Sequence, residues 1–252
     1  MEIYLTNLLM RMSDDSYCDE SERIEGRFES IKTVAWKATE EARQLNKVHL
    51  FDSLYTFVNT AIETEKRQRA YFIIGSIASN SANIEATIYL IAKLKVEKKG
   101  ETIDNILRLL QNIFKPATID IEPILKLTEH HISYIRWSSY LALTNTGHNI
   151  EPFLRDKLKI SKNKEDILSL MYSLKYVGTE KALVLIEPHI KNRTFEMKFA
   201  ALEAMAVIML RNGFSLTSVS NRLKLPIQAA PGFNIEDFRK LQDSLASLTR
   251  PG

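Results

Sequence analysis

The chain has 252 residues and a formal net charge of +3, with 45% apolar and 26% charged residues, a composition typical of a folded protein rather than a disordered one. Its eight glycines and seven prolines are few for this length, whereas all-β folds need both residues at frequent turns. The single cysteine, Cys18, excludes an intramolecular disulfide and a cysteine-rich zinc site. The most apolar stretch, residues 200–210, is too short to cross a bilayer. We therefore expect an all-helical cytoplasmic protein with no membrane segment.

The start of the chain is apolar and then strongly acidic. The first twelve residues lack the basic start and the cleavage site of a signal peptide, so we expect none. The acidic segment at residues 13–25 holds six carboxylates against Arg23, a net charge of −5 that leaves +8 on the rest of the chain. Two interpretations stay open: an arm that engages a basic partner, and a solvated N-terminal loop.

One pattern occurs in four segments, three of them at a spacing of 31 residues. A shift of 31 places Leu143 and Gly147 of the segment from Tyr134 on Leu174 and Gly178, a further 31 leads to the segment from Glu196, and an earlier copy begins at Lys66. A basic residue is followed three positions later by a small residue, and four positions beyond by an apolar one. Small residues let neighbouring helices approach closely, and apolar residues at this spacing form one buried stripe. The pattern therefore predicts the first helix of a repeated helix pair.

A second series alternates with the first. It comprises NIEATIYL from Asn83, DIEPILKL from Asp120, NIEPFLRD from Asn149, the weaker TEKALVLI from Thr179, and NIEDFRKL from Asn234. Each copy starts with a helix-capping residue, and its glutamate falls in the first turn, where the helix dipole favours an anion.

Together the two series predict about six helix pairs in a single domain of residues 1–252. The expected pairs lie at residues 24–63, 66–96, 102–132, 134–161, 164–192 and 195–248, with an irregular insertion at 212–233 in the last pair.

The segments IRWSSYLAL and MKFAALEAM resemble the first helix of HEAT repeats, especially of the HEAT-like repeats of the PBS-lyase type. The resemblance extends over residues 67–209. It implies an all-α fold, an α-solenoid or superhelix of about six HEAT-like helix pairs, in which the second helices line the concave surface. It also implies a scaffold that usually binds proteins and sometimes nucleic acid.

No motif for common enzyme chemistry is present. The chain has no Gly-x-Ser-x-Gly, no glycine-rich phosphate loop and no His-Glu-x-x-His, so we expect neither catalysis nor a cofactor. His130 and His131 point about 100° apart on a helix and cannot share a metal with each other, so they are expected at a helix end. HEAT-like DNA glycosylases use aromatic and acidic residues in a basic cleft, but no tryptophan-rich segment with a nearby aspartate accompanies Trp36 or Trp137.

The candidate partner-binding residues lie on the predicted second helices, beside their apolar stripes. They are Glu85, Tyr89, Lys93, Glu122, Lys126, Glu129, Glu151, Arg155 and Lys159. The recurring glutamates have two open interpretations, an acidic ladder for a partner and helix-start residues.

We expect a non-catalytic protein-binding scaffold, one form of which is a stoichiometric inhibitor such as an immunity protein that covers a toxin. Nucleic-acid binding is the alternative, suggested by the +8 charge and by Lys93, Lys95, Lys98 and Lys99, with a glycosylase as its enzymatic form. A structural subunit of a larger assembly also stays open.

Overall fold

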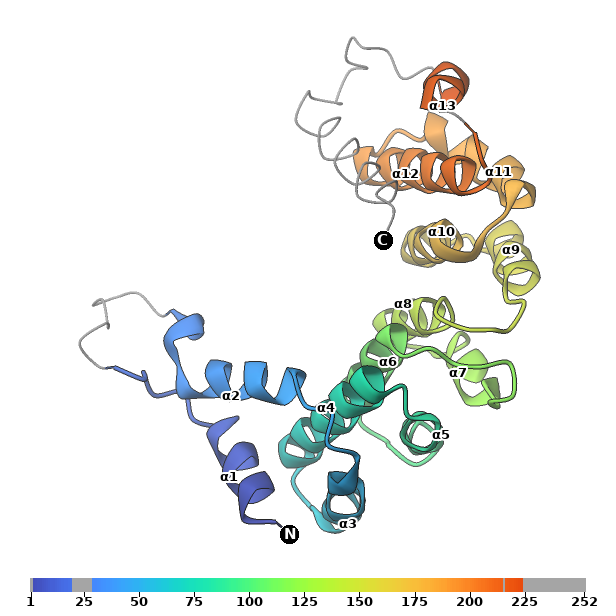
Figure 1. The fold of residues 1–252 in the computed structure, drawn as a ribbon. Coiled ribbons are helices and arrows are strands. Elements are labelled where there is room, and N and C mark those ends of the chain that lie inside the picture. The colour runs from blue at the N-terminus through green and yellow to red at the C-terminus, as the bar shows by residue number, and fades with distance from the viewer. Residues whose placement is uncertain (1, 20–28, 215, 224–252) are drawn as a thin grey trace. The chain divides into compact units, whose positions relative to one another are not determined.

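The computed structural model describes residues 2–19, 29–214 and 216–223, and these residues form helices and turns without any β-strand (Figure 1). The prediction of an all-helical protein is confirmed for this part of the chain. The chain divides into two compact units, Met1–His148 and Asn149–Gly252. The expectation of one continuous domain over residues 1–252 stays a prediction.

The first unit consists of α-helices that pack on the next helix in the chain and on the one after it. They are α1 (Ile3–Arg11), α2 (Val34–Arg43), α3 (Phe51–Thr60), α4 (Thr64–Ser81), α5 (Ile84–Lys93), α6 (Gly100–Asn112), α7 (Glu122–Leu127) and α8 (Ser133–Ala142). Helix α4 packs against α2 and α6, and α6 packs against α8. Helices α3 and α5 pack against α4, and α5 also contacts α6 and α7. Every second helix from α2 to α8 therefore contacts the next in that series.

The second unit repeats this arrangement. Its helices are α9 (Glu151–Ile160), α10 (Lys164–Val177), α11 (Glu180–Ile186), α12 (Phe195–Arg211) and α13 (Leu216–Leu223). Helix α10 packs against α9 and α12, while α11 contacts α9 and α12, and α13 contacts α12.

The first five predicted helix pairs each correspond to two observed helices, from α2 and α3 in the first range to α10 and α11 in the fifth, whereas only α12 of the last pair can be matched. Two features differ from the expectation. Helix α1 was not predicted, although its buried Leu5, Leu8 and Leu9 have helical spacing. The predicted irregular insertion at 212–233 contains α13. Three predicted features lie wholly or partly outside the described residues: the insertion from 224 to 233, the helix start at Asn234, and the acidic segment from 20 to 25.

The small and apolar positions of the sequence repeat are core positions. Ala70, Ser139 and Ala201 are fully buried, as are Ile74 and Leu143. Small side chains at these sites let successive helices approach, because a bulkier group would hold their axes apart.

The basic position of the repeat has a separate role in the first unit. The Arg67 guanidinium donates to the carbonyl oxygens of Ala61 (3.0 Å) and Ile62 (2.9 Å), directly after α3. The Arg136 guanidinium donates in the same way to His130 (2.9 Å) and His131 (3.2 Å), in the turn after α7. Both arginines therefore satisfy backbone carbonyls of the turn that joins a second helix to the next first helix.

Candidate functional site

The predicted partner-binding residues are distributed over both units. Six of them lie on α5, on α7 and in the turn after α7, in the first unit, and three lie on α9 in the second. The structure brings the α5 residues together with residues of α3, and α5 in turn contacts α7. We call the row formed by α3, α5 and α7 the second-helix face of the first unit.

Helices α3 and α5 run parallel along this face. The rings of Tyr55 on α3 and Tyr89 on α5 stack with their centroids 3.9 Å apart. One turn later, Lys93 Nζ donates to Asn59 Oδ1 over 2.6 Å. The two contacts have the same separation along the chain, as two parallel helices require. Tyr89 and Lys93 therefore help to hold the face together, and the Lys93 ammonium also lies 5.0 Å from the Tyr89 ring centroid.

The two tyrosines are contact groups rather than acid–base groups. Their hydroxyl oxygens are buried and have no hydrogen-bond partner among the described residues. Burial, with the nearby charges of Glu85 and Asp52, raises the pKa of Tyr55 to about 12. Burial likewise raises the pKa of Tyr89. Both phenols stay neutral at ordinary pH and offer aromatic area to a partner.

Exposed isoleucines lie on α5, the helix that carries Tyr89, and the sequence analysis missed them. Ile84 and Ile88 are each 49% exposed, although large aliphatic side chains are usually buried. The signal was present in NIEATIYL, which has more apolar residues than one buried stripe requires. Glu85, between these isoleucines in the chain, is exposed in the first turn of the helix. The face therefore combines apolar, aromatic and charged groups.

The α7 part of the face is charged. Glu122, Lys126 and Glu129 are all exposed. Lys126 Nζ lies 3.9 Å from Glu122 Oε1, a pairing between residues four apart on a helix surface. Such an exposed pair contributes little to stability, so both groups are available to another molecule.

The α9 residues differ from one another in accessibility. Glu151 is buried, and its carboxylate accepts a hydrogen bond from Thr179 Oγ1 over 2.9 Å at the start of α11. This glutamate therefore serves packing between α9 and α11 instead of a surface. Arg155 is half-buried, with its Nε lacking a partner among the described residues. Lys159 is exposed and pairs with Asp156 at 2.8 Å.

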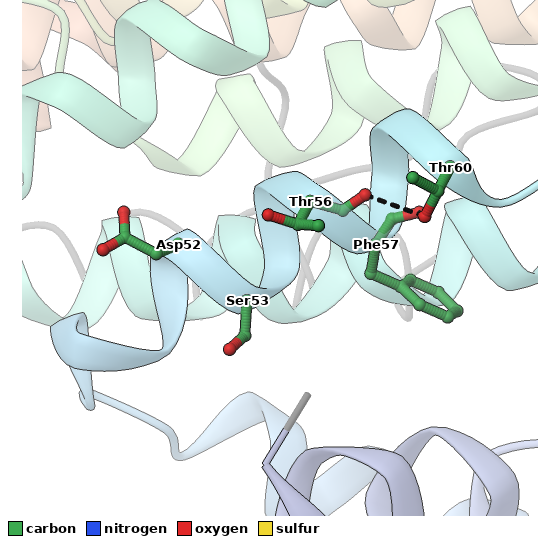
Figure 2. Close-up of a pocket in the computed structure, with 5 residues that line it drawn as sticks. All are labelled: Asp52, Ser53, Thr56, Phe57 and Thr60. Carbon is green, nitrogen blue, oxygen red and sulfur yellow. Dashed lines mark hydrogen bonds between the residues drawn. The ribbon is translucent and has the colours of Figure 1, made fainter.

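A shallow hollow lies on another side of α3 (Figure 2). It has a volume of about 340 Å³ and is lined by Asp52, Ser53, Thr56, Phe57 and Thr60. The Thr60 hydroxyl donates to the Thr56 carbonyl at 2.9 Å, so it is already satisfied within the helix. Asp52 is the only titratable group of the lining, and a single carboxylate without a base, nucleophile or second acid offers no complete catalytic set.

The described histidines do not form a metal site. The rings of His130 and His131 stack at 4.3 Å, and His130 Nδ1 accepts the backbone N–H of Ile132 at 3.1 Å. The His148 ring bonds the Ile119 carbonyl through Nε2 at 2.8 Å. No group of three metal-binding side chains occurs in residues 2–19, 29–214 and 216–223.

No helix in the described ranges is both long and apolar enough to cross a membrane. No protein-family model matches the sequence, and no curated protein matches it significantly. The HEAT-like resemblance accordingly stays a prediction, and the inferences below start from the geometry of the second-helix face.

Proposed function

We propose that this chain is a non-catalytic α-solenoid of stacked helix pairs that binds another protein with its second-helix face. The observation that supports the proposal is the composition of that face. Half-exposed isoleucines lie on the same helix as Tyr89 of the tyrosine stack, and exposed charges lie on α5 and α7. Protein interfaces characteristically combine an apolar and aromatic centre with a polar rim.

The order of the helix contacts supports the solenoid. In the first unit α2, α4, α6 and α8 contact one another in sequence, and α3, α5 and α7 do the same on their side. Repeat proteins have this nearest-neighbour pattern, which gives them an extended face for binding. The contact set excludes Glu151, which is buried.

A stoichiometric inhibitor, such as an immunity protein that covers a toxin, is the form of this function that we favour. Such a protein needs no chemistry of its own, and the charged rim of the face provides groups that select an oppositely charged partner. Nucleic-acid binding is the second candidate, because Lys95, Lys98 and Lys99 are exposed in and after the turn between α5 and α6.

The test is an affinity capture of the tagged chain from its own organism, with and without nuclease, followed by mass spectrometry. The expected result is a stoichiometric protein that survives nuclease and is lost with Ile88→Glu or Lys126→Glu. The matched controls are Ile62→Glu, at a 93% exposed isoleucine between α3 and α4, and Lys37→Glu on α2. Loss of all specific material after nuclease would favour the nucleic-acid alternative, and equal loss in the controls would refute the proposed face.

A further inference from the structure

Helix α5 leaves one side uncovered, and that side is apolar. Ile84 and Ile88 are each 49% exposed and Val96 is 62% exposed, and Ala92 between them is exposed as well. These residues follow one another at intervals of four, so they lie along one ridge of the helix surface. The Val96 N–H donates to the Lys93 carbonyl at 3.1 Å, so the chain makes one further helical turn beyond the last residue of α5. We call these four residues the apolar ridge.

Charges of opposite sign lie at the two ends of the apolar ridge. Glu85 is in the first turn of α5, and Lys95 is in the turn that follows the helix. Both side chains are exposed, and neither forms an ion pair with another described residue. Lys93 is different, because Asn59 and the Tyr89 ring already hold its ammonium.

The apolar ridge is complementary to a reversed copy of itself. When two α5 helices lie antiparallel, one register gives three kinds of contact: Ile84 with the partner's Val96, Glu85 with the partner's Lys95, and Ile88 with the partner's Ala92. A two-fold axis makes each contact twice. Apolar groups then meet apolar groups, opposite charges meet, and the two helix dipoles run in opposite directions.

We propose that the side of α5 bearing the apolar ridge is an interface between two copies of this chain. The inference rests on the proposed function, since it takes the second-helix face as a contact surface and names a second copy as its occupant. A stable interface buries about 800 Å² on each partner, more than one short ridge provides. Helices α3 and α7, which contact α5, supply the adjoining area, and the dimer is expected to dissociate on dilution.

The first test is sedimentation velocity of the full chain over a wide concentration range. The expected result is a shift from the 28.9 kDa monomer to a species of twice that mass as the concentration rises. Ile88→Glu should raise the dissociation constant at least about tenfold, because it buries a charge at the centre of the ridge. The control Ile62→Glu should leave it unchanged. A monomer at every concentration, or a dimer that Ile88→Glu does not weaken, overturns the proposal.

The second test addresses the register through the charges. Glu85→Lys and Lys95→Glu should each weaken the dimer, because every pair then joins like charges. An equimolar mixture of the two variants should recover dimers of mixed composition, in which each Lys faces a Glu. Circular dichroism of each variant checks that its helices are intact. If each variant alone forms a weaker dimer and the mixture of the two does not restore dimerisation, this register is refuted.

The two proposals fail in different ways. A monomeric chain that still captures a foreign protein through Ile88 and Lys126 overturns the self-association and leaves the proposed function standing. A dimer sensitive to Ile88→Glu in a chain that captures no foreign protein removes the inhibitor and leaves the interface between copies.

Discussion

Lys115 is expected to make the stability of the first unit rise with pH. Its side chain is fully buried just after α6, where Nζ donates to the carbonyl oxygens of Leu110 at 2.6 Å and Ile113 at 2.7 Å. Burial lowers the pKa of Lys115 from 10.5 to about 7. The folded protein therefore holds this amine with a weaker affinity for its proton than the unfolded chain does.

The sign of the effect follows from this difference. Between the folded and unfolded pKa values, the unfolded chain binds more protons, so the free energy of unfolding rises with pH by up to about 1.4 kcal/mol per pH unit. The two carbonyl acceptors favour the ammonium form and limit the fall in pKa. We expect a gain of about 1 to 3 kcal/mol between about pH 7.5 and pH 9.5. The range ends at pH 9.5 because the unfolded chain loses the Tyr55 proton near the ordinary pKa of 10, whereas the folded protein keeps this proton up to a pKa of about 12. Above pH 9.5 the Tyr55 contribution therefore makes stability fall as the pH rises.

Urea unfolding followed by circular dichroism over this pH range measures the effect. Lys115→Met keeps a flexible chain in the site but cannot titrate, so its stability should lose most of the dependence on pH. The slope is the readout, because methionine also leaves both carbonyls without their donor and lowers stability at every pH. Lys37→Met, at an exposed lysine on α2, should keep the slope of the unsubstituted protein. Equal slopes in the protein and in Lys115→Met would refute the reasoning.

Two further predictions concern the α4 backbone. Gly75→Ala should lower the free energy of unfolding by about 0.5 to 2 kcal/mol. A Cβ there would lie 2.8 Å from Leu109 Cδ2 on α6, and this overlap outweighs the gain of about 0.5 to 1 kcal/mol from alanine in a helix interior. Thermal unfolding measures the loss, and Ser79→Ala at an exposed site on the same helix is the control. Ala82→Gly should raise stability by about 0.5 to 1 kcal/mol, since Ala82 ends α4 with a φ of 50°, a left-handed conformation that glycine adopts without strain; a lower melting temperature would contradict this.

The helix starts could be predicted because their signals are local. Of the predicted capping residues, Asn83 accepts from the Ala86 N–H at 2.8 Å and Thr179 accepts from the Lys181 N–H at 3.3 Å. Asn149 does not cap its helix, because α9 begins after Ile150 and has no side-chain cap. A cap needs only residues within one turn, so the sequence alone shows it. The spacing of small and apolar residues is equally local, and it identified the buried positions of the repeat.

The partner-binding residues could be predicted only in part, because exposure depends on residues distant in the chain. Glu85 and Glu151 have the same local pattern, yet the first is exposed and the second is buried by contact with Thr179. Similarly, Lys93 is engaged by Asn59 of another helix. Nothing within one turn of either residue shows these contacts.

The arginine contacts of the first unit suggest where the chain could be shortened without exposing unsatisfied carbonyls. Arg67 on α4 donates to the carbonyls that follow α3, and Arg136 on α8 donates to the carbonyls that follow α7. A terminus placed between α3 and α4 would separate such a pair, whereas one placed in the turn between α4 and α5 would keep it. The end of a shortened chain should therefore lie between a first helix and the second helix that follows it, which is one helix out of step with the pairs in the sequence repeat.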